Sequence, residues 1–230
     1  MSSIIENLNW SFLASRLISI IPVLFCLTVH ELAHGDAAYK LGDPTAKELG
    51  RLTLNPIKHI DPLGLIMMIY ARFGWAKPVP VNMMNFKRPK RDMAITALAG
   101  PMSNIILAAI ALFIFGLVYT PLGGGQASQG SAAGVAFEMI QQTAFLSIAL
   151  AVFNMLPIPP LDGSKVLFSI VSDNVYNKLM QYERYGMILL MLILFVPYTS
   201  PYFSSFIYTA VGTILDGLYF IARAAFDLVN

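Results

Sequence analysis

Two histidines and a glutamate lie close together in the stretch Thr28-Val29-His30-Glu31-Leu32-Ala33-His34. On an α-helix, residues four apart differ by about 40° around the axis and about 6 Å along it, so His30 and His34 can both reach one metal ion. Glu31 is turned by about 100° from His30, which leaves its carboxylate free to accept a proton from a nearby water molecule. The spacing therefore indicates two metal ligands and a general base, although the same pattern also occurs by chance on ordinary helices.

A catalytic zinc site typically uses three protein ligands and keeps its fourth position for water, so a third donor must come from elsewhere in the chain. The candidates are Asp36, Asp43, His59, Asp61 and Asp162. Asp36 faces away from His34 on the same helix, and the prolines beside His59 and Asp61 favour turn formation there. Taken alone, Asp162 is best explained as a helix N-cap. It follows a helix that prolines interrupt at its end, however, and this interruption could direct its carboxylate towards the histidine motif. These residues alone leave the third ligand open.

The composition predicts an integral membrane protein. Of the 230 residues, 57% are hydrophobic and 12% are charged, and the mean hydropathy is +0.65. Soluble domains carry about 25% charged residues, because they must cover their core with a polar surface. The single cysteine, Cys26, lies in an apolar run, which excludes an internal disulfide and leaves the redox compartment open. The first apolar segment lacks the features of a cleaved signal peptide, so we expect it to be retained.

The histidine motif stands at the end of the first apolar stretch that is long enough to cross a bilayer. The stretch from Trp10 to Val29 would form about 30 Å of helix, and we expect this helix to continue to about Tyr39 before Gly42-Asp43-Pro44 ends it. Further spans are expected at residues 94–120 and 137–156. Leu161-Asp162-Gly163 and a short helix to about residue 171 follow, and then one or two more spans at 185–196 and 203–220.

The segment between the first two spans has a different character. Ten of the fifteen Lys and Arg residues lie between Lys40 and Arg91, among frequent prolines. Residues 63–71 are apolar but too few to span, which suits a re-entrant or interfacial piece. Residues 74–86 are expected to be extended and confined to an edge, because each proline restricts the residue before it and removes a donor. We therefore predict an all-α polytopic membrane protein with short membrane-associated β or re-entrant segments between its first and second spans.

The basic residues also predict an orientation. They gather at 40–91 and 163–184. The uncharged Gly- and Ser-rich loop at 121–136, which we expect to be flexible, and the loop at 197–203 have none. By the positive-inside rule the basic segments are cytoplasmic, the N-terminus is outside, and the C-terminus is inside if there are five spans. Residues 30–34, 100–104 and 154–162 then share one depth near the inner side. Charged groups in a bilayer cost about 2.5–3.5 kcal/mol each, so this cluster is interpreted as a functional site.

Three stretches resemble, in order and spacing, the motifs of the site-2 protease family, which are intramembrane zinc metalloproteases: His30-Glu31-Leu32-Ala33-His34, Gly100-Pro101-Met102-Ser103-Asn104 and Asn154-Met155-Leu156-Pro157-Ile158-Pro159-Pro160-Leu161-Asp162-Gly163. Residues 41–46 and 74–82 resemble the small bacterial and archaeal branch, and the likeness covers about residues 20–170. The resemblance implies a three-helix catalytic core with about two further transmembrane helices, and one Zn²⁺ per chain held by His30, His34 and Asp162. It also implies Glu31 as general base and places Asn104 and Asn154 near the substrate or oxyanion, where interhelical hydrogen bonds explain them equally well.

The resemblance further implies a single intramembrane metalloprotease domain over residues 1–230, with a core at about 11–171, C-terminal spans at about 185–225, and no PDZ or nucleotide-sensing domain. The expected partners are a transmembrane protein substrate and the lipid bilayer, with no nucleic acid. The expected location is a prokaryotic cell membrane, with the active site near its cytoplasmic side. The substrate, the oligomeric state and the number of spans, from four to six, are left open.

Two other classes of function compete with this interpretation. A non-catalytic membrane scaffold or chaperone could keep a structural metal site, and it would tolerate Glu31→Gln. A metal transporter would need polar residues along a whole transbilayer path, and outside the inner cluster the expected spans carry almost none. For a protease, an unwound substrate needs new backbone partners, which the 74–86 segment could supply by β-augmentation.

Overall fold

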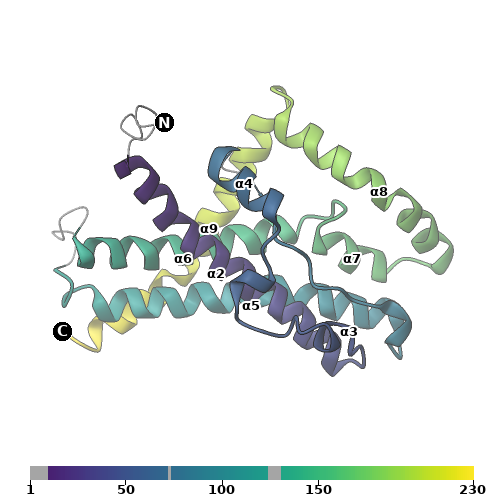
Figure 1. Cartoon of the computed structure of the whole chain (residues 1–230), viewed down its shortest axis with the longest axis horizontal. Helices are drawn as coiled ribbons and strands as arrows, with labels where there is room; N and C mark the ends of the chain where they lie inside the picture. Colours follow the sequence, from purple (N-terminus) through teal and green to yellow (C-terminus); the bar gives the residue numbers. More distant parts are fainter. Residues whose placement is uncertain (1–9, 72–73, 124–130) are drawn as a thin grey trace, which may run out of the picture.

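The computed structural model describes residues 10–71, 74–123 and 131–230 as a bundle of long helices (Figure 1). Four helices in this part of the chain are long and apolar enough to cross a bilayer: α2 (Trp10–Lys40), α5 (Pro89–Val118), α6 (Ala132–Asn154) and α9 (Ser200–Asp227). The prediction of an all-α polytopic membrane protein is confirmed. The leader at residues 1–9 and residues 124–130 of the neutral loop expected at 121–136 lie outside the described residues.

The spans extend beyond the apolar stretches that identify them. Helix α2 ends at Lys40 as expected, because Gly42 follows with a φ of 111° and leaves the helical conformation. Helix α5 begins at Pro89 instead of residue 94, since a proline at the first helical position has no N–H that needs a partner. Helix α6 begins at Ala132 instead of residue 137, after Ser131 accepts a hydrogen bond from the Gly134 amide.

Helix α5 lies at the centre of the bundle and packs against α2, α6 and α9 and the short helix α7 (Asp162–Ser169). Small residues line these contacts, so the helices approach closely. Ala108, Ala144 and Ala222 are buried, and a methyl group on Gly116 would clash with the backbone oxygen of Ala222. Such small side chains are typical of packing between membrane helices, where close backbone approach supplies the stabilisation.

The segment between α2 and α5 consists of short helices joined by extended chain. These are α3 (Thr45–Glu48), η1 (Pro56–Lys58), α4 (Pro62–Ala71) and η2 (Met83–Asn85). The predicted strands are not confirmed: in the described part of this segment the β-pairing is one bridge, between Ile60 and Ala76. Pro78 and Pro80 explain this, because neither has an N–H to donate to a ladder. The apolar stretch at 63–71 belongs to α4, and its re-entrant character stays a prediction.

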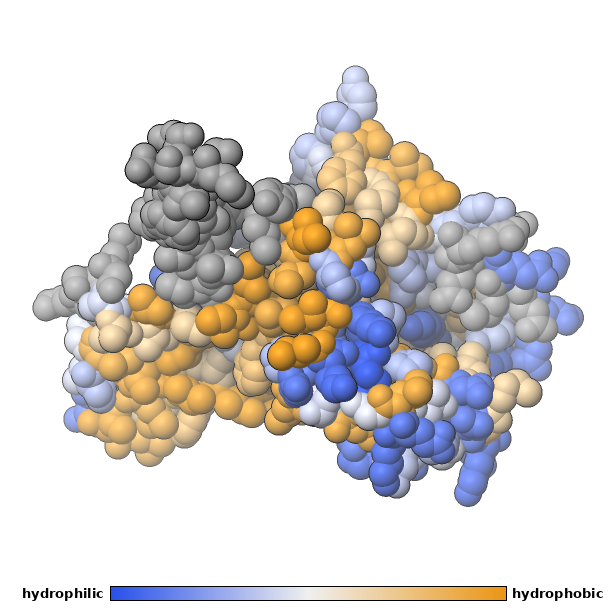
Figure 2. Space-filling model, viewed as in Figure 1, coloured by the Kyte–Doolittle hydropathy of each residue, from blue (hydrophilic) through white to orange (hydrophobic). Residues whose placement is uncertain are grey.

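Asp43 fastens this segment to the end of α2. Its carboxylate accepts hydrogen bonds of 2.7 Å from the Asn82 amide and from the Asn85 side chain. Burial raises the pKa of Asp43, but the hydrogen bonds from Thr45, Asn85 and Asn82 outweigh burial, and the net pKa is lowered. The hydrophilic residues of this region gather at one end of the molecule, on the right of Figure 2, whereas hydrophobic residues cover the helices beside it.

The C-terminal half of the chain adds α8 (Asp173–Phe195) and α9. The apolar part of α8, Tyr185–Phe195, is too short to count as a span, so the fifth span expected at 185–196 is not found among the described helices. Helix α9 runs parallel to α5: Val211 packs with Ala108, and the Thr120 hydroxyl donates to Asn230. The C-terminus therefore lies at the end of the bundle opposite to the basic segment (Figure 1).

Candidate metal centre

Helices α2, α5 and α7 bring three potential metal ligands together. His30 and His34 lie one turn apart on α2, and Asp162 is the first residue of α7. Asp162 Oδ2 lies 3.2 Å from His30 Nε2 and 3.1 Å from His34 Nε2, and the two Nε2 atoms are 3.0 Å apart. Of the candidates for a third ligand, Asp162 is the residue that the structure places beside both histidines.

The donor set fits one zinc ion. Ligand atoms about 2.0–2.2 Å from a tetrahedral zinc are separated from one another by about 3.3–3.6 Å. The three donor atoms lie at nearly this spacing, within 4.8 Å of one another. Two imidazole nitrogens and one carboxylate oxygen match the three-ligand class of catalytic zinc sites, which keeps a fourth position for water.

Each imidazole ring has a second contact, through its Nδ1 atom, that can fix its orientation. His34 Nδ1 lies 2.7 Å from the Thr96 carbonyl oxygen on α5, which fixes the proton on Nδ1 and leaves Nε2 for a metal. His30 Nδ1 lies 3.2 Å from the Asn104 amide nitrogen, while the buried Asn104 Oδ1 has no partner among the described residues. Turning this amide by 180° would let Oδ1 accept from His30 Nδ1–H and would satisfy both groups.

Gly100 gives the two imidazoles their space. A Cβ atom at this position would lie 2.7 Å from His30 Cε1 and closer still to His34 Nε2. Any side chain on this turn of α5 would therefore push the rings out of position. The glycine of the stretch at 100–104 is explained by the close approach of α5 to the histidines of α2.

Asp162 does not cap its helix, contrary to the explanation that the sequence favours when this residue is taken alone. Leu161 occupies the N-cap position, and Asp162 makes no capping hydrogen bond. Burial raises the pKa of Asp162, but its hydrogen bonds with His30 and His34 and the nearby Lys165 charge lower it further, so the net pKa is well below its usual range. The lowered pKa favours the ionised carboxylate, which is the form that can bind a metal.

Glu31 faces a cavity beside His30, His34 and Asp162. The cavity has a volume of about 310 Å³ and is lined by these four residues together with Asn154, Lys165 and the extended chain at Pro78, Val79 and Val81. Glu31 Oε2 accepts a hydrogen bond of 2.8 Å from the Val79 amide. The carboxylate is thus positioned at the cavity wall and is separate from the metal-binding group.

The two asparagines predicted near a substrate occupy different places. Asn154 lines the cavity, and its Nδ2 donates to the Leu150 carbonyl on its own helix. Asn104 is fully buried and contacts His30. A role in binding a substrate or an oxyanion stays a prediction for both residues. Of the two, Asn154 lines the cavity and Asn104 does not.

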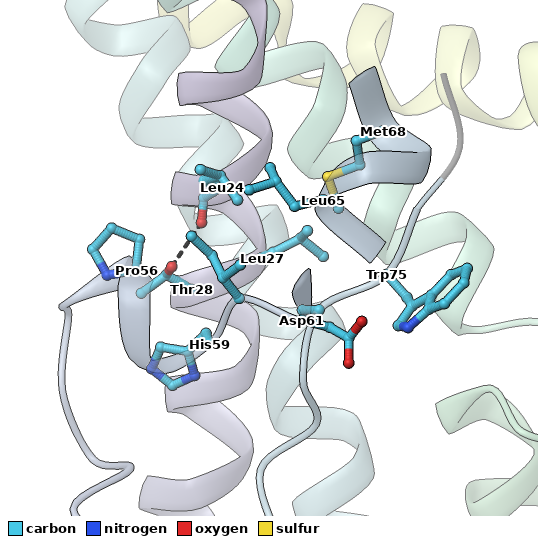
Figure 3. A pocket seen from close by; sticks show the side chains of 11 residues that line it. Leu24, Leu27, Thr28, Pro56, His59, Asp61, Leu65, Met68 and Trp75 are labelled. Atoms are coloured by element: carbon cyan, nitrogen blue, oxygen red, sulfur yellow. Dashed lines mark hydrogen bonds between the residues drawn. The ribbon is translucent and has the colours of Figure 1, made fainter. Parts of the chain in front are cut away.

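The remaining candidate ligands have other partners. The Lys40 ammonium donates to Asp36, and Asp61 caps α4 by accepting from the Gly64 amide. His59 Nε2 lies 2.9 Å from the Thr53 carbonyl oxygen, and its ring is buried. His59 and Asp61 line a cavity of about 10 Å³ between α2 and α4 (Figure 3), which has room for one water molecule.

Sequence reasoning missed several contacts of the site. The Thr96 carbonyl and the Val79 amide are backbone groups, so their residue types carry no signal for these roles. Lys165 has its ammonium 3.7 Å from Asp162 Oδ1 and could have been found, since it lies three residues after Asp162 on the same helix.

Comparison with known proteins finds one family model and several relatives that are similar to this chain. A sequence model described as Peptidase family M50 matches residues 118–196. The chain is 42% identical over 181 residues to the "Putative zinc metalloprotease YwhC" of Bacillus subtilis, covering 79% of this chain and 81% of that protein. It is 30% identical to the "Putative zinc metalloprotease Rip2" of Mycolicibacterium smegmatis over 80% of this chain and 69% of that protein. It is also 32% identical to the "Putative zinc metalloprotease MJ0611" of Methanocaldococcus jannaschii over 69% of this chain and 73% of that protein. No solved structure matches.

Proposed function

The chain belongs to peptidase family M50, the family of the site-2 proteases, and from this premise we propose that it is a zinc-dependent intramembrane endopeptidase. Its substrates would be peptide bonds in or near the transmembrane segments of other membrane proteins. The observation that carries the proposal is the His30–His34–Asp162 cluster, which shares one cavity with Glu31 within a bundle of membrane-length helices.

His30, His34 and Asp162 would hold one zinc ion per chain. Zinc in such a site polarises a carbonyl group and lowers the pKa of water to near 7. Glu31 would accept a proton from the attacking water and return it to the leaving amine. Its hydrogen bond from the Val79 amide supports this role, because that bond fixes the carboxylate against the cavity wall. Asn154 would offer its amide to a substrate carbonyl, since it lines the same cavity.

A transmembrane substrate would have to unwind before cleavage, because a helix hides its peptide groups in its own hydrogen bonds. Residues 78–81 run in extended form along the cavity and could pair with the unwound chain. Pro78 and Pro80 have no N–H, and the Val79 amide is used by Glu31, so carbonyl groups would make most of the pairing at these positions. The substrate would therefore present its own N–H groups to this wall.

The basic end of the bundle supports an orientation. The cavity lies beside the Lys- and Arg-rich segment between α2 and α5, which the positive-inside rule assigns to the cytoplasm. The protein would then lie in a prokaryotic cell membrane, with the N-terminus outside and the active site near the cytoplasmic side. Water would enter from that side. The lipid bilayer and a transmembrane substrate would be its partners, and no nucleic acid.

The main alternative is a membrane scaffold that keeps the metal for structure. The two proposals separate in a reconstituted cleavage assay on a panel of single-span membrane proteins, with zinc measured in the same samples. We expect Glu31→Gln to keep zinc and abolish cleavage, and Asp162→Ala to lose zinc. Asp36→Asn, on the same helix but outside the cavity, serves as the matched control and should change neither. Cleavage by Glu31→Gln at the wild-type rate would refute the protease proposal.

A further inference from the structure

Helix α9 has one face packed into the bundle and one exposed surface. Its apolar face packs into the bundle through residues such as Ile207, Val211, Leu218 and Ala222. The rest of the helix surface is exposed, and this exposed surface is not uniformly apolar. In a helix that spans a bilayer, exposed polar side chains face either lipid or another protein, so their arrangement on α9 matters.

Six of the polar and glycine residues of α9 form a stripe along the helix. At 100° per residue, six positions fall within an arc of about 60°, roughly 150° away from the packed face. We define the polar stripe by these residues: Ser205, Thr209, Gly212, Asp216, Arg223 and Asp227. Five of the six are exposed, and around Gly212 there is open space. Neighbouring residues of the stripe are three, four or seven positions apart in the sequence, which is the spacing found along a contact between two helices.

Asp216 lies deep within the span. It is about 24 Å of helix from Ser200 and about 17 Å from Asp227, so it falls near the middle of a hydrocarbon core about 30 Å thick. In the described ranges neither Asp216 nor Arg223 makes a hydrogen bond or an ion pair. A charged side chain left at this depth in lipid is strongly unfavourable, and intramembrane charges are therefore almost always paired. The polar stripe is incomplete without a partner.

Symmetry argues against a second copy of this chain as that partner. Two copies in one membrane have the same orientation, so a symmetric contact between their α9 helices would place each residue of the stripe near its own equivalent. Asp216 would face Asp216 and Arg223 would face Arg223. Like charges in a low-dielectric environment repel strongly. A complementary helix instead needs a basic residue at the depth of Asp216 and an acidic residue about 10 Å further along, opposite Arg223.

We propose that the polar stripe of α9 docks a transmembrane helix of a different protein that carries a Lys or Arg near the middle of the bilayer. Gly212 allows the backbone of this helix to approach closely, and Ser205 and Thr209 offer hydroxyl groups on the same line. None of the residues lining the Glu31 cavity belongs to α9, so this partner is bound away from the metal centre. The proposal does not depend on the proteolytic function.

Designed helices test the charge complementarity. The full-length chain is reconstituted in phosphatidylcholine vesicles with a fluorescent poly-leucine transmembrane helix that carries one central Lys, or with the same helix without it, and association is measured by energy transfer. We expect the Lys helix to bind about fivefold to thirtyfold more tightly, as one interhelical polar contact would give. Asp216→Leu should remove the difference, and Asp216→Lys should transfer the preference to a helix with a central Glu.

A matched glycine pair tests the location. Gly212 and Gly217 both have open space around them, but Gly217 lies about 100° away from Asp216 on the helix. We expect Gly212→Leu to weaken binding of the Lys helix at least fivefold and Gly217→Leu to leave it unchanged. Equal binding of the Lys and all-leucine helices to the wild type would overturn the proposal.

Cross-linking tests the excluded partner. A Thr209→Cys variant in a Cys26→Ala background should not cross-link to a second copy of itself in the membrane. Ser204→Cys, about 140° away on the helix, is the control. If Thr209→Cys cross-links efficiently to a second copy and Ser204→Cys does not, a second copy covers the stripe and the proposal is overturned.

Discussion

Gly100→Ala is a small change that should disable the metal centre. The added Cβ would lie 2.7 Å from His30 Cε1 and nearer to His34 Nε2, whereas ordinary van der Waals contact begins near 3.4 Å. The rings would have to move by at least about 0.7 Å. Neither ring is free to do so, because His34 is held by the Thr96 carbonyl and His30 contacts Asn104.

This displacement exceeds what a zinc site tolerates, since metal–ligand distances vary by only about 0.2 Å. Loss of outer hydrogen bonds alone typically lowers metal affinity about 10- to 100-fold. Displacement of the ligands themselves should therefore lower zinc affinity at least about 100-fold, or about 2.7 kcal/mol. Overpacking between α2 and α5 should also reduce the unfolding free energy by about 1–3 kcal/mol.

The assay is competition for zinc with a chelator of known affinity, on protein purified in detergent, with thermal unfolding measured in parallel. Gly217→Ala is the control, because nothing lies within 4 Å of a Cβ at that position, and it should bind zinc like the wild type. Zinc affinity of Gly100→Ala within threefold of the wild type, in a folded protein, would refute the geometry described for this site.

Three further changes test the surroundings of the site. Asn104→Ala should lower zinc affinity about 10- to 100-fold, because His30 loses the side chain that orients its ring; unchanged affinity would mean that Asn104 acts elsewhere. Val79→Pro removes the N–H that donates to Glu31, so we expect kcat for substrate cleavage to fall about tenfold or more with zinc affinity unchanged. Val79→Ala keeps this N–H, and its kcat should stay within about threefold of the wild type. Asp43→Asn should lower the Tm at neutral pH. Because the folded pKa of Asp43 lies below its unfolded value, its contribution is complete above about pH 5 and is lost as the pH falls through the folded pKa, so the Tm difference between wild type and variant should shrink below about pH 4. A pH-independent difference would contradict this assignment.

Much of the helical framework could be predicted from the sequence because hydropathy reports directly on the bilayer. The spans α2, α5, α6 and α9 were expected within a few residues at most ends, and the family was recognised from three short motifs. The strand expected at 74–86 is not confirmed, because the proline pattern specifies extended backbone without specifying a pairing partner. The fifth span expected at 185–196 stays a prediction, since the described apolar part of α8, Tyr185–Phe195, is shorter than a bilayer crossing.

The sequence by itself determined that His30 and His34 share a helix face with Glu31 turned aside, because helical spacing is a local property. It also identified Asp162 as one of several possible third donors. Only the tertiary structure brought Asp162 to the two imidazoles, emptied the space at Gly100, and turned the Thr96 carbonyl and the Val79 amide towards His34 and Glu31. These contacts join residues far apart in the chain, and two of them use backbone groups that every residue type provides. Their identity depends on how the helices pack and could not be read from local pattern.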